Sequence, residues 1–490
     1  MNLRMIFNTL GKSSIALAGL LILPTITSLV CNDGCAWVFA ITIGIALLVG
    51  ILLTCFVKPR HTAIFSREGF VTVSLVWIYF SLVGALPFVI SGQIPNYIDA
   101  LFETVSGFTT TGATILTGTQ IESLPKGLQF WRSFTNWIGG MGIIVFVMVF
   151  ATGSQDRSIH VLRAEMPGTT VDKLVPRARD TAKMLYLIYA GMTALLFVLL
   201  MCGGMPFFDS LLHAFSTAGT GGFGIKADSI ASYSNFCQWV ITIFMFLFGV
   251  NFNVYCLLAL RRVKSALSSQ EVFMYCGITL VTVATITINL FGLFPYTESF
   301  GDALRIASFQ TVSFMTTAGF TNIPASSNVN FFPQLSKWML LLVMFIGGCA
   351  GSTAGGLKVS RVGMLCCAVK KEIRRLLHPR SANVVKFEGK VLTDETLQSV
   401  GTYFVVYMFI MAVALVVLSF DPNGKIDFVT NFSALTSCFN NIGPAYGEAV
   451  GGFFVFSYFS KIVLTIAMLL GRLEIFPLLI FFHPSTWKRQ

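Results

Sequence analysis

The sequence predicts an all-α membrane protein in which two N-terminal helices precede four similar helical repeats that surround one central axis. Of the 490 residues, 55% are hydrophobic and only 11% are charged, a charged fraction that is rare in soluble proteins. Apolar runs of about 20 residues recur, and this length crosses the hydrocarbon core of a bilayer as an α-helix. A short polar phrase centred on glycine also returns four times along the chain.

The apolar runs predict ten membrane spans. They cover residues 13–30, 36–57, 69–92, 128–152, 180–203, 234–260, 272–294, 332–350, 396–420 and 453–482. An even number of spans places both termini on the same side of the membrane. The connecting segments on that side hold 25 of the 33 Lys and Arg residues, whereas the opposite segments hold five. Because basic residues are enriched in cytoplasmic loops, we expect both termini to be cytoplasmic.

The formal net charge of +11 is explained by these basic loops, which favour lipid headgroups over nucleic acid as their neighbours. The outer segments hold 11 acidic residues against five basic ones, and this excess modestly concentrates cations at the outer face. The eleven cysteines lack metal-ligand spacing. Cys31 and Cys35 share the first outer loop, where they form either a disulfide or two free thiols.

After the first two spans, the chain divides into four units with the same order of features. Each unit has a span, a short outer helix, the glycine phrase and a second span. The predicted division is an N-terminal helix pair at 1–68 and repeats at 69–152, 180–260, 272–395 and 396–490. The third repeat includes a glycine-rich interruption and a cytoplasmic extension.

Each glycine phrase follows a segment in which apolar residues recur at helical spacing after an aspartate. The four aspartates are Asp99, Asp209, Asp302 and Asp427. Aspartate accepts hydrogen bonds from the unpaired N–H groups at a helix N-terminus, and its charge is favourable at the positive end of the helix dipole. We expect helices of about 10–14 residues, or roughly 15–20 Å, which reach only halfway across a bilayer.

The chain after each half-helix must lie within protein or line a wet cavity, because lipid pairs with no backbone N–H or C=O group. Four such segments are best explained if they meet around one axis, where their carbonyl oxygens replace the hydration shell of a cation. Glycine permits the backbone conformation that this requires. The phrases contain no acidic residue, which favours a monovalent over a divalent cation. The predicted ion-coordinating residues are Thr110, Thr111, Gly112, Thr220, Gly221, Gly222, Thr317, Ala318, Gly319, Asn441, Ile442 and Gly443.

The alternative is that these glycines only ease helix packing or form loops. This explanation would suffice for one phrase, but it does not account for four copies that each follow a half-helix and precede a span. In the second phrase, the sequence does not decide which of Gly221 and Gly222 is structurally central.

Six motifs carry a family likeness over nearly the whole chain. They are VSGFTTTGATIL (105–116), AGTGGF (218–223), TTAGFTN (316–322), FNNIGPAYG (439–447), GGMGIIV (139–145) and GGCAGSTAGGLK (347–358). Together they resemble the TrkH/TrkG branch of the Trk/Ktr/HKT superfamily of potassium-translocating proteins. The resemblance implies potassium uptake across the bacterial inner membrane through a gated, selective pore formed by one chain. It further implies potassium as the transported ion, no organic cofactor in this chain, a homodimer, and a cytoplasmic TrkA-like ring of nucleotide-binding RCK domains.

The eighth span is interrupted by IGGCAGSTAGGL at 346–357, whose glycines have poor helix propensity. The resemblance implies that this segment is an intramembrane loop that obstructs the pore and moves on activation. Tight packing of small residues between helices is the alternative. The expected gating residues are Gly347, Gly348, Gly351, Ser352, Thr353, Gly355, Gly356 and Arg472.

Arg472 is a charged residue in the last predicted span, where a charge is costly and usually functional. It either pairs with Glu474 or another carboxylate, or it faces the pore. The resemblance implies an electrostatic barrier to cations beside the obstructing loop. The alternative is that the side chain extends to the cytoplasmic interface.

An intramembrane enzyme and a coupled symporter are the competing classes of function. An enzyme needs a metal-binding His/Glu pair, a Ser–His arrangement or paired Asp within the spans, and the five histidines form no HExxH motif. We therefore expect that the chain is not an enzyme. A potassium symporter coupled to protons or sodium is a nearer alternative, although such folds often have two inverted repeats with carboxylates at the midplane. This chain has four parallel repeats.

Overall fold

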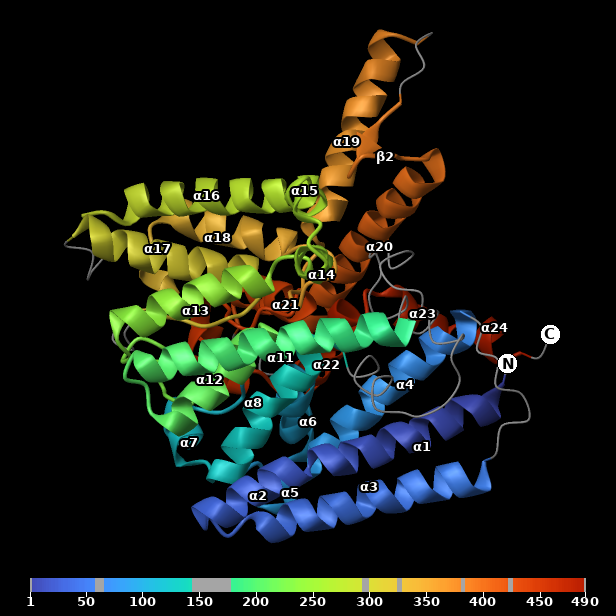
Figure 1. Ribbon diagram of the computed structural model, residues 1–490, viewed down its shortest axis with the longest axis vertical. Helices are drawn as coiled ribbons and strands as arrows, with labels where there is room; N and C mark the ends of the chain where they lie inside the picture. The colour runs from blue at the N-terminus through green and yellow to red at the C-terminus, as the bar shows by residue number, and fades with distance from the viewer. Residues whose placement is uncertain are drawn as a thin grey trace.

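The computed structural model describes residues 2–57, 66–142, 178–292, 299–323, 328–379, 384–421 and 426–488, which are almost entirely helical. The N-terminal pair consists of α1 (Leu3–Leu20), α2 (Ile22–Cys31) and α3 (Ala36–Phe56). Helices α1 and α3 lie side by side (Figure 1) and cross where Gly11 meets Gly50, so that small residues bring the two backbones together. Cys31 and Cys35 are free thiols.

Four units follow, each with a long helix, a half-helix and a second helix. The first contains α4 (Ser66–Gly84), α5 (Leu86–Ile90), α6 (Tyr97–Phe108), α7 (Gly118–Ser123) and α8 (Lys126–Gly140). The second contains α11 (Ala178–Cys202), α12 (Phe207–Gly219), α13 (Asn235–Phe248), α14 (Phe252–Ala259) and α15 (Val263–Leu267). The third contains α16 (Gln270–Leu290), α17 (Phe300–Met315), α18 (Gln334–Ile346) and α19 (Val359–Leu377). The fourth contains α20 (Asp394–Leu418), α21 (Phe428–Phe439), α22 (Tyr458–Arg472), α23 (Phe476–Phe482) and α24 (Pro484–Trp487).

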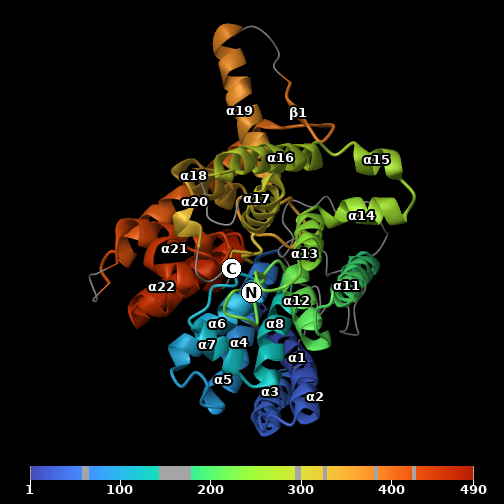
Figure 2. The same ribbon diagram turned by 90° about the vertical axis from the view of Figure 1, so that its left-hand side faces the viewer.

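The four units surround a common centre in chain order (Figure 2). The half-helices α6, α12, α17 and α21 contain 12, 13, 16 and 12 residues, which corresponds to about 18–24 Å at the helical rise. The predicted all-α class with four repeats is therefore confirmed, and only α17 exceeds the expected length. Asp427 caps α21 by accepting a hydrogen bond from the Thr430 N–H, whereas the other three aspartates lie in the first turns of their helices.

The second helix of every unit is short, with 15, 14, 13 and 15 residues in α8, α13, α18 and α22. The predicted continuous spans 234–260 and 453–482 are wrong, because the chain bends by 88° between α13 and α14 and by 117° between α22 and α23. Asn251 caps a new helix in the first case. In the second, Glu474 and Ile475 adopt positive φ before a proline near the start of α23. The end of the predicted span 128–152 lies outside the described residues.

Within the described ranges, six helices are long and apolar enough to cross a membrane, and eight if each bent pair counts as one span. The described residues therefore contain fewer continuous spans than the ten that the sequence predicts. The interruption predicted in the eighth span is present: α18 ends at Ile346, and a non-helical segment precedes α19.

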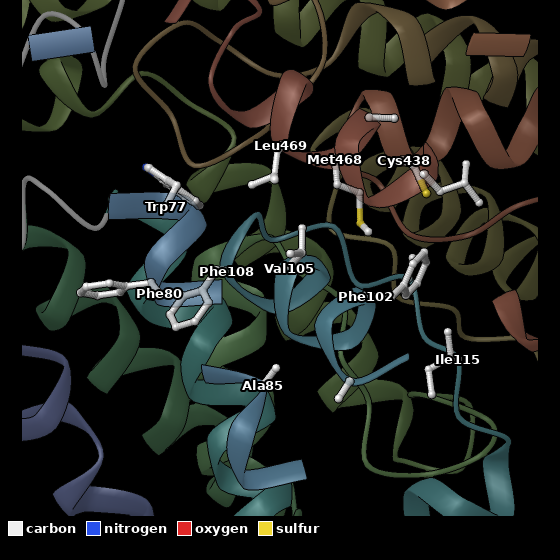
Figure 3. Close-up of a cluster of buried hydrophobic side chains, with 14 of the residues drawn as sticks. Trp77, Phe80, Ala85, Phe102, Val105, Phe108, Ile115, Cys438, Met468 and Leu469 are labelled. Atoms are coloured by element: carbon white, nitrogen blue, oxygen red, sulfur yellow. The ribbon is translucent and has the colours of Figure 1, made fainter. Parts of the chain in front are cut away.

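The largest buried apolar cluster joins the first and fourth units (Figure 3). Phe108 at the end of α6 packs its ring edge-on against Phe80 and Trp131, with centroids 5.8 and 5.9 Å away. The Trp131 indole N–H donates to the Gly84 carbonyl at 3.0 Å, which satisfies the polar atom of a fully buried ring. Aromatic packing thus fixes α4, α6 and α8 around the end of the first half-helix.

Helices α19 and α20 project away from the remaining helices (Figure 1). Between them lies a two-stranded hairpin, β1 (Lys386–Phe387) and β2 (Lys390–Val391), in which Lys386 is opposite Val391 and Phe387 is opposite Lys390. Helix α19 and the hairpin correspond in sequence to the extension that the sequence predicts within the third repeat, 272–395.

Gly139 in α8 lies so close to α6 that a Cβ atom there would collide with the backbone oxygen of Phe108. We expect Gly139→Ala to reduce the free energy of unfolding by about 1–3 kcal/mol or more, because overpacking must shift a backbone. The matched control is Gly277→Ala in α16, where no atom lies within 4 Å of the added methyl group. Thermal unfolding of both purified variants in detergent tests this prediction. Equal melting temperatures would contradict the close contact.

Candidate functional site

The four glycine phrases have the same backbone conformation. Each half-helix is followed by a non-glycine residue in the left-handed region, with φ between 53° and 56°, and two positions later by a glycine with φ between 64° and 105°. The non-glycine residues are Thr110, Thr220, Thr317 and Asn441, and the glycines are Gly112, Gly222, Gly319 and Gly443. In the second phrase, Gly222 is therefore the equivalent of the other three glycines. A left-handed non-glycine residue is uncommon and costly, so its recurrence at four equivalent positions indicates a shared constraint.

A buried serine ends each half-helix in the same way. The backbone N–H of the residue before the positive-φ glycine donates to a serine carbonyl five positions earlier, at 2.8–2.9 Å in all four units. The serines are Ser106, Ser216, Ser313 and Ser437. This is the helix-ending pattern that a left-handed residue permits. Each half-helix therefore terminates directly at its phrase and presents the negative end of its dipole there.

The phrases form a closed ring in which each glycine touches the next phrase. A Cβ atom on any of the four glycines would lie at most 2.6 Å from a carbonyl oxygen of the neighbouring phrase. The successive contacts are Gly112 to the Gly221 oxygen, Gly222 to Ala318, Gly319 to Ile442, and Gly443 back to Thr111. Real Cβ contacts are longer than 3.0 Å, so only glycine allows this approach.

The side chains that flank these glycines are directed into the protein. Thr111, Thr220, Thr317 and Ile442 are fully buried, whereas Gly112, Gly222 and Gly319 remain partly accessible. The Asn441 amide donates to the Thr111 hydroxyl at 3.0 Å and so joins the fourth phrase to the first. The accessible surface of the ring is thus largely backbone, which is the arrangement expected where carbonyls line a wet space.

A buried ion pair contacts the chain that directly follows the first two phrase glycines. The Arg132 Nε atom donates to Glu103 at 2.6 Å, and both side chains are almost completely buried. The Glu103 carboxylate also accepts from the Thr114 hydroxyl and the Ile115 N–H, at 2.9 and 3.0 Å. Arg132 also donates to the Gly224 carbonyl at 2.8 Å.

Gln310 has the equivalent place in the third unit, nine residues before its glycine, and donates to Thr321 and Asn322 at 3.0 and 3.1 Å. Sequence reasoning missed these residues. The signal that was available is a polar residue nine positions before the phrase glycine, at Glu103, His213 and Gln310.

The segment 347–358 folds back against one side of the ring. The Gly355 N–H donates to the Thr317 hydroxyl at 2.6 Å, and the Gly356 N–H donates to the Asn440 carbonyl at 3.1 Å. On the opposite side of the segment, the Cys349 N–H donates to the Gly249 carbonyl at 3.0 Å. The segment therefore touches the second, third and fourth units, in agreement with a non-helical loop rather than a tightly packed helix.

Within this loop, Gly347, Gly351 and Gly356 have φ between 72° and 77°. A Cβ atom on Gly348 would approach the Ala354 side chain at 2.6 Å, and one on Gly355 would collide with the Asn440 carbonyl. The Ser352 hydroxyl donates to the Cys349 carbonyl at 2.7 Å, within the loop. The glycines are therefore needed for a compact turn with close backbone contacts.

Arg472 is the last residue of α22 and lies between the loop and the ring. Its guanidinium donates to the Thr353 carbonyl at 2.9 Å and to the Gly139 and Gly140 carbonyls at 2.5 and 2.8 Å. It is also 3.3 Å from the Thr110 hydroxyl. These contacts lie between the loop and the ring, so the alternative of an arginine that extends to the membrane interface is not supported.

A cavity of about 50 Å³ lies next to Arg472 and is large enough for a few water molecules. Its lining includes Asn441 from the ring, Gly355 from the loop, and Lys358. Glu474 pairs with Arg361, which also lies 4.3 Å from the centre of the Tyr403 ring. The side of the ring that faces the loop thus carries an excess of positive charge, which includes Arg472.

Lys461, the other basic residue in the last predicted span, lies near the opposite end of α22 from Arg472. Its ammonium group is 2.7 Å from Asp99 at the start of the first half-helix, and the pair is largely buried. This contact joins the fourth unit to the first at the N-terminal end of α6, whereas the Asn441–Thr111 hydrogen bond joins them beyond its C-terminal end. His213 is buried in α12, and its Nδ1–H group donates to the Asp209 carbonyl at 2.8 Å.

Comparison with known proteins identifies the family. Residues 36–489 match the model of the TrkH family, which is described as a cation transport protein. The chain is 36% identical to the Trk system potassium uptake protein TrkH of Salmonella typhimurium over the full length of both chains. It is 33% identical to TrkG of Escherichia coli, with 95% of this chain and 94% of that protein covered. Among solved structures, the crystal structure of the potassium transporter TrkH from Vibrio parahaemolyticus superposes with a TM-score of 0.89, at 32% identity and full coverage of both chains.

The likeness extends over the whole chain in both sequence and fold, and four of the six motifs quoted above form the central ring. The chain therefore belongs to the TrkH family of cation transport proteins.

Proposed function

We propose that this chain is the membrane subunit of a potassium uptake system and that potassium passes through the ring of glycine phrases. The observation that carries the proposal is the closed cycle of contacts from Gly112 through Gly222, Gly319 and Gly443 back to Thr111. A cation at the centre of that cycle exchanges its hydration shell for backbone oxygens. The selectivity residues are the twelve predicted from the sequence, with Gly222 as the central glycine of the second phrase.

Two features of the ring favour a monovalent cation. The phrases contain no carboxylate, and the negative ends of four half-helix dipoles supply only fractional charge. A ring of partial charges balances the hydration energy of a large, weakly hydrated ion more readily than that of a divalent ion. The relatives named as potassium uptake proteins support potassium as the ion.

The segment 347–358 and Arg472 form the proposed gate. In this conformation the loop covers the cytoplasmic side of the ring, and Arg472 places a positive charge in the cavity through which a cation would leave. Opening requires that the loop lose its hydrogen bonds to Thr317 and Asn440 and that Arg472 move or be neutralised by solvent. The gating residues are those expected from the sequence.

The cellular arrangement follows from the same proposal. The protein is a multi-pass membrane protein, which we propose lies in the bacterial inner membrane with both termini cytoplasmic. It acts as a homodimer with a cytoplasmic ring of TrkA-like, nucleotide-binding RCK domains. The functional units are the helix pair 1–68 and the repeats 69–152, 180–260, 272–395 and 396–490. Neither catalysis nor an organic cofactor in this chain is part of the proposal.

Reversal potentials of the purified protein in planar bilayers test the proposed transport. With opposed potassium and proton gradients, the current should reverse at the potassium equilibrium potential. A reversal potential that shifts with the proton or sodium gradient would instead support coupled symport. Absence of a potassium current or flux, with and without the cytoplasmic partner, would overturn the proposal.

Gly319→Ser should reduce the potassium-over-sodium permeability ratio by roughly tenfold, because the added side chain displaces the Ile442 carbonyl from the ring. The matched control is Gly34→Ser in the first outer loop. Gly34 has a similar φ of 74°, but no atom lies within 4 Å of the added Cβ. Bi-ionic reversal potentials give the ratio directly. An unchanged ratio in Gly319→Ser would exclude this glycine from the selective site.

Arg472→Ala should raise potassium flux in the absence of the cytoplasmic partner by roughly tenfold, because it removes a positive charge from the exit of the ring. Arg472→Lys keeps the charge and should remain close to the unmodified protein. Potassium efflux from vesicles that contain equal amounts of each variant provides the measurement. Equal flux in both variants would show that charge at this position does not limit conduction.

A further inference from the structure

Glu271 is a buried carboxylate that the proposed conduction path does not use. It is the second residue of α16 and only 4% exposed. One carboxylate oxygen accepts from the Ala350 N–H at 2.6 Å and from the Ser360 N–H at 3.2 Å. The Asn251 side chain also hydrogen-bonds this group. Ala350 lies in the intramembrane loop, Ser360 in the first turn of α19, and Asn251 at the break before α14. One carboxylate therefore joins three breaks in helical structure.

The hydrogen bonds that the Glu271 carboxylate accepts are stronger than those between neutral groups. The first N–H groups of a helix have no partner within the helix, and the dipole there favours negative charge. A carboxylate that accepts from such a group makes a charge-assisted hydrogen bond, about twice as strong as a neutral one. The Ala350 N–H is buried, so loss of the carboxylate would leave a buried donor without its present partner. The charge-assisted bonds and the cost of an unpaired Ala350 N–H group both stabilise the loop in the position that blocks the ring.

The β1–β2 hairpin holds the first turn of α16 from the other side. The Glu388 carboxylate accepts from the Glu271 N–H at 2.6 Å and from the Ser269 hydroxyl at 3.0 Å. The Glu388 N–H donates to the Gln270 side chain at 3.0 Å. Ser269 is the N-cap of α16. Glu388 thus contacts three consecutive residues that begin with this cap.

Glu388 occupies an unfavourable backbone position. It forms the two-residue turn of the hairpin with Gly389, and their φ angles are 51° and 69°. Turns with two left-handed residues prefer Asn, Asp or Gly at the first position, so a glutamate there is disfavoured. The contacts with α16 give a physical reason for it.

The neighbouring Phe387 anchors the hairpin to α19. Its side chain is 8% exposed, and a Cβ atom on Gly363 of α19 would lie 2.7 Å from its ring. The hairpin therefore bridges α16, whose first turn carries Glu271, and α19, whose first turn donates to the Glu271 carboxylate.

We propose that Glu271 is a positioning residue that holds the intramembrane loop in its blocking position, and that the β1–β2 hairpin sets the position of Glu271 through Glu388. Displacement of the hairpin from the start of α16 would then weaken the hold on Ala350 and Ser360 and favour loop opening. This inference rests on the proposed function, since it assigns a control element to the proposed gate.

The experiment compares Glu271→Gln and Glu388→Gln in the full-length protein reconstituted without its cytoplasmic partner. Both variants should increase potassium flux on the order of tenfold, because each loses a charge-assisted hydrogen bond that favours the closed loop. The potassium-over-sodium permeability ratio and the unitary conductance should not change, because the ring is untouched. In the double variant, the fold-increase in potassium flux should be smaller than the product of the two single fold-increases, because Glu388 acts on the loop through Glu271. Glu372→Gln, an exposed carboxylate on α19 that pairs with Arg375, is the matched control.

Flux like that of the control in both variants would overturn the inference, as would multiplicative effects in the double variant. Melting temperatures report whether each variant folds. If Glu271→Gln folds poorly, Glu388→Gln still tests the inference, because Glu388 is exposed and its substitution leaves the buried packing intact. A changed permeability ratio would mean that Glu271 acts on the ring and would also overturn the assignment. Failure of the proposed function is distinct: the unmodified protein would then carry no potassium flux at all.

Discussion

The close approach of each phrase glycine to a carbonyl of the next phrase is the constraint on which the rest of the structure depends. Four such contacts close into a cycle, so no phrase can move without displacing its neighbour. Three kinds of contact hold the segments around this cycle. Serine carbonyls end the half-helices, and the Glu103–Arg132 ion pair contacts the chain that follows the first two phrases. The Lys461–Asp99 ion pair joins the fourth unit to the first. Buried charges are costly unless paired, and Arg132 and Lys461 each bond across a unit boundary, to the Gly224 carbonyl and to Asp99.

The ends of the short second helices surround the side of the ring that faces the loop and Arg472. Helices of 13–15 residues are too short to cross a bilayer core, so backbone groups become available below the ring. The Gly139, Gly249 and Asn440 carbonyls accept from Arg472 or from the intramembrane loop. The ends of α8 and α13 therefore supply two of the acceptors that hold the proposed gate, and the end of the half-helix α21 supplies the third. A gate held mainly by hydrogen bonds to backbone can be released without disruption of the apolar packing.

The sequence predicted the fold class, the repeat order and the four phrases because repetition and apolar length are local signals. It also predicted the loop at 346–357, where several glycines occur together. It did not predict the breaks at Gly249 and Glu474, because one glycine or a left-handed glutamate leaves the apolar pattern of a span intact. The Glu103–Arg132 pair joins residues 29 positions apart, and the Glu271–Ala350 bond joins residues 79 apart, so only the fold reveals them. Gly222 was separable from Gly221 only by its φ angle.

The most direct test of the central claim is the location of bound cations in the purified protein. Crystals grown with thallium or rubidium in place of potassium would reveal them by anomalous scattering. The account predicts peaks on the central axis, within coordination distance of the Thr111, Gly221, Ala318 and Ile442 oxygens, that are lost when sodium replaces the heavier ion. Ordered cations elsewhere in the protein, with none at the centre of this ring, would contradict it.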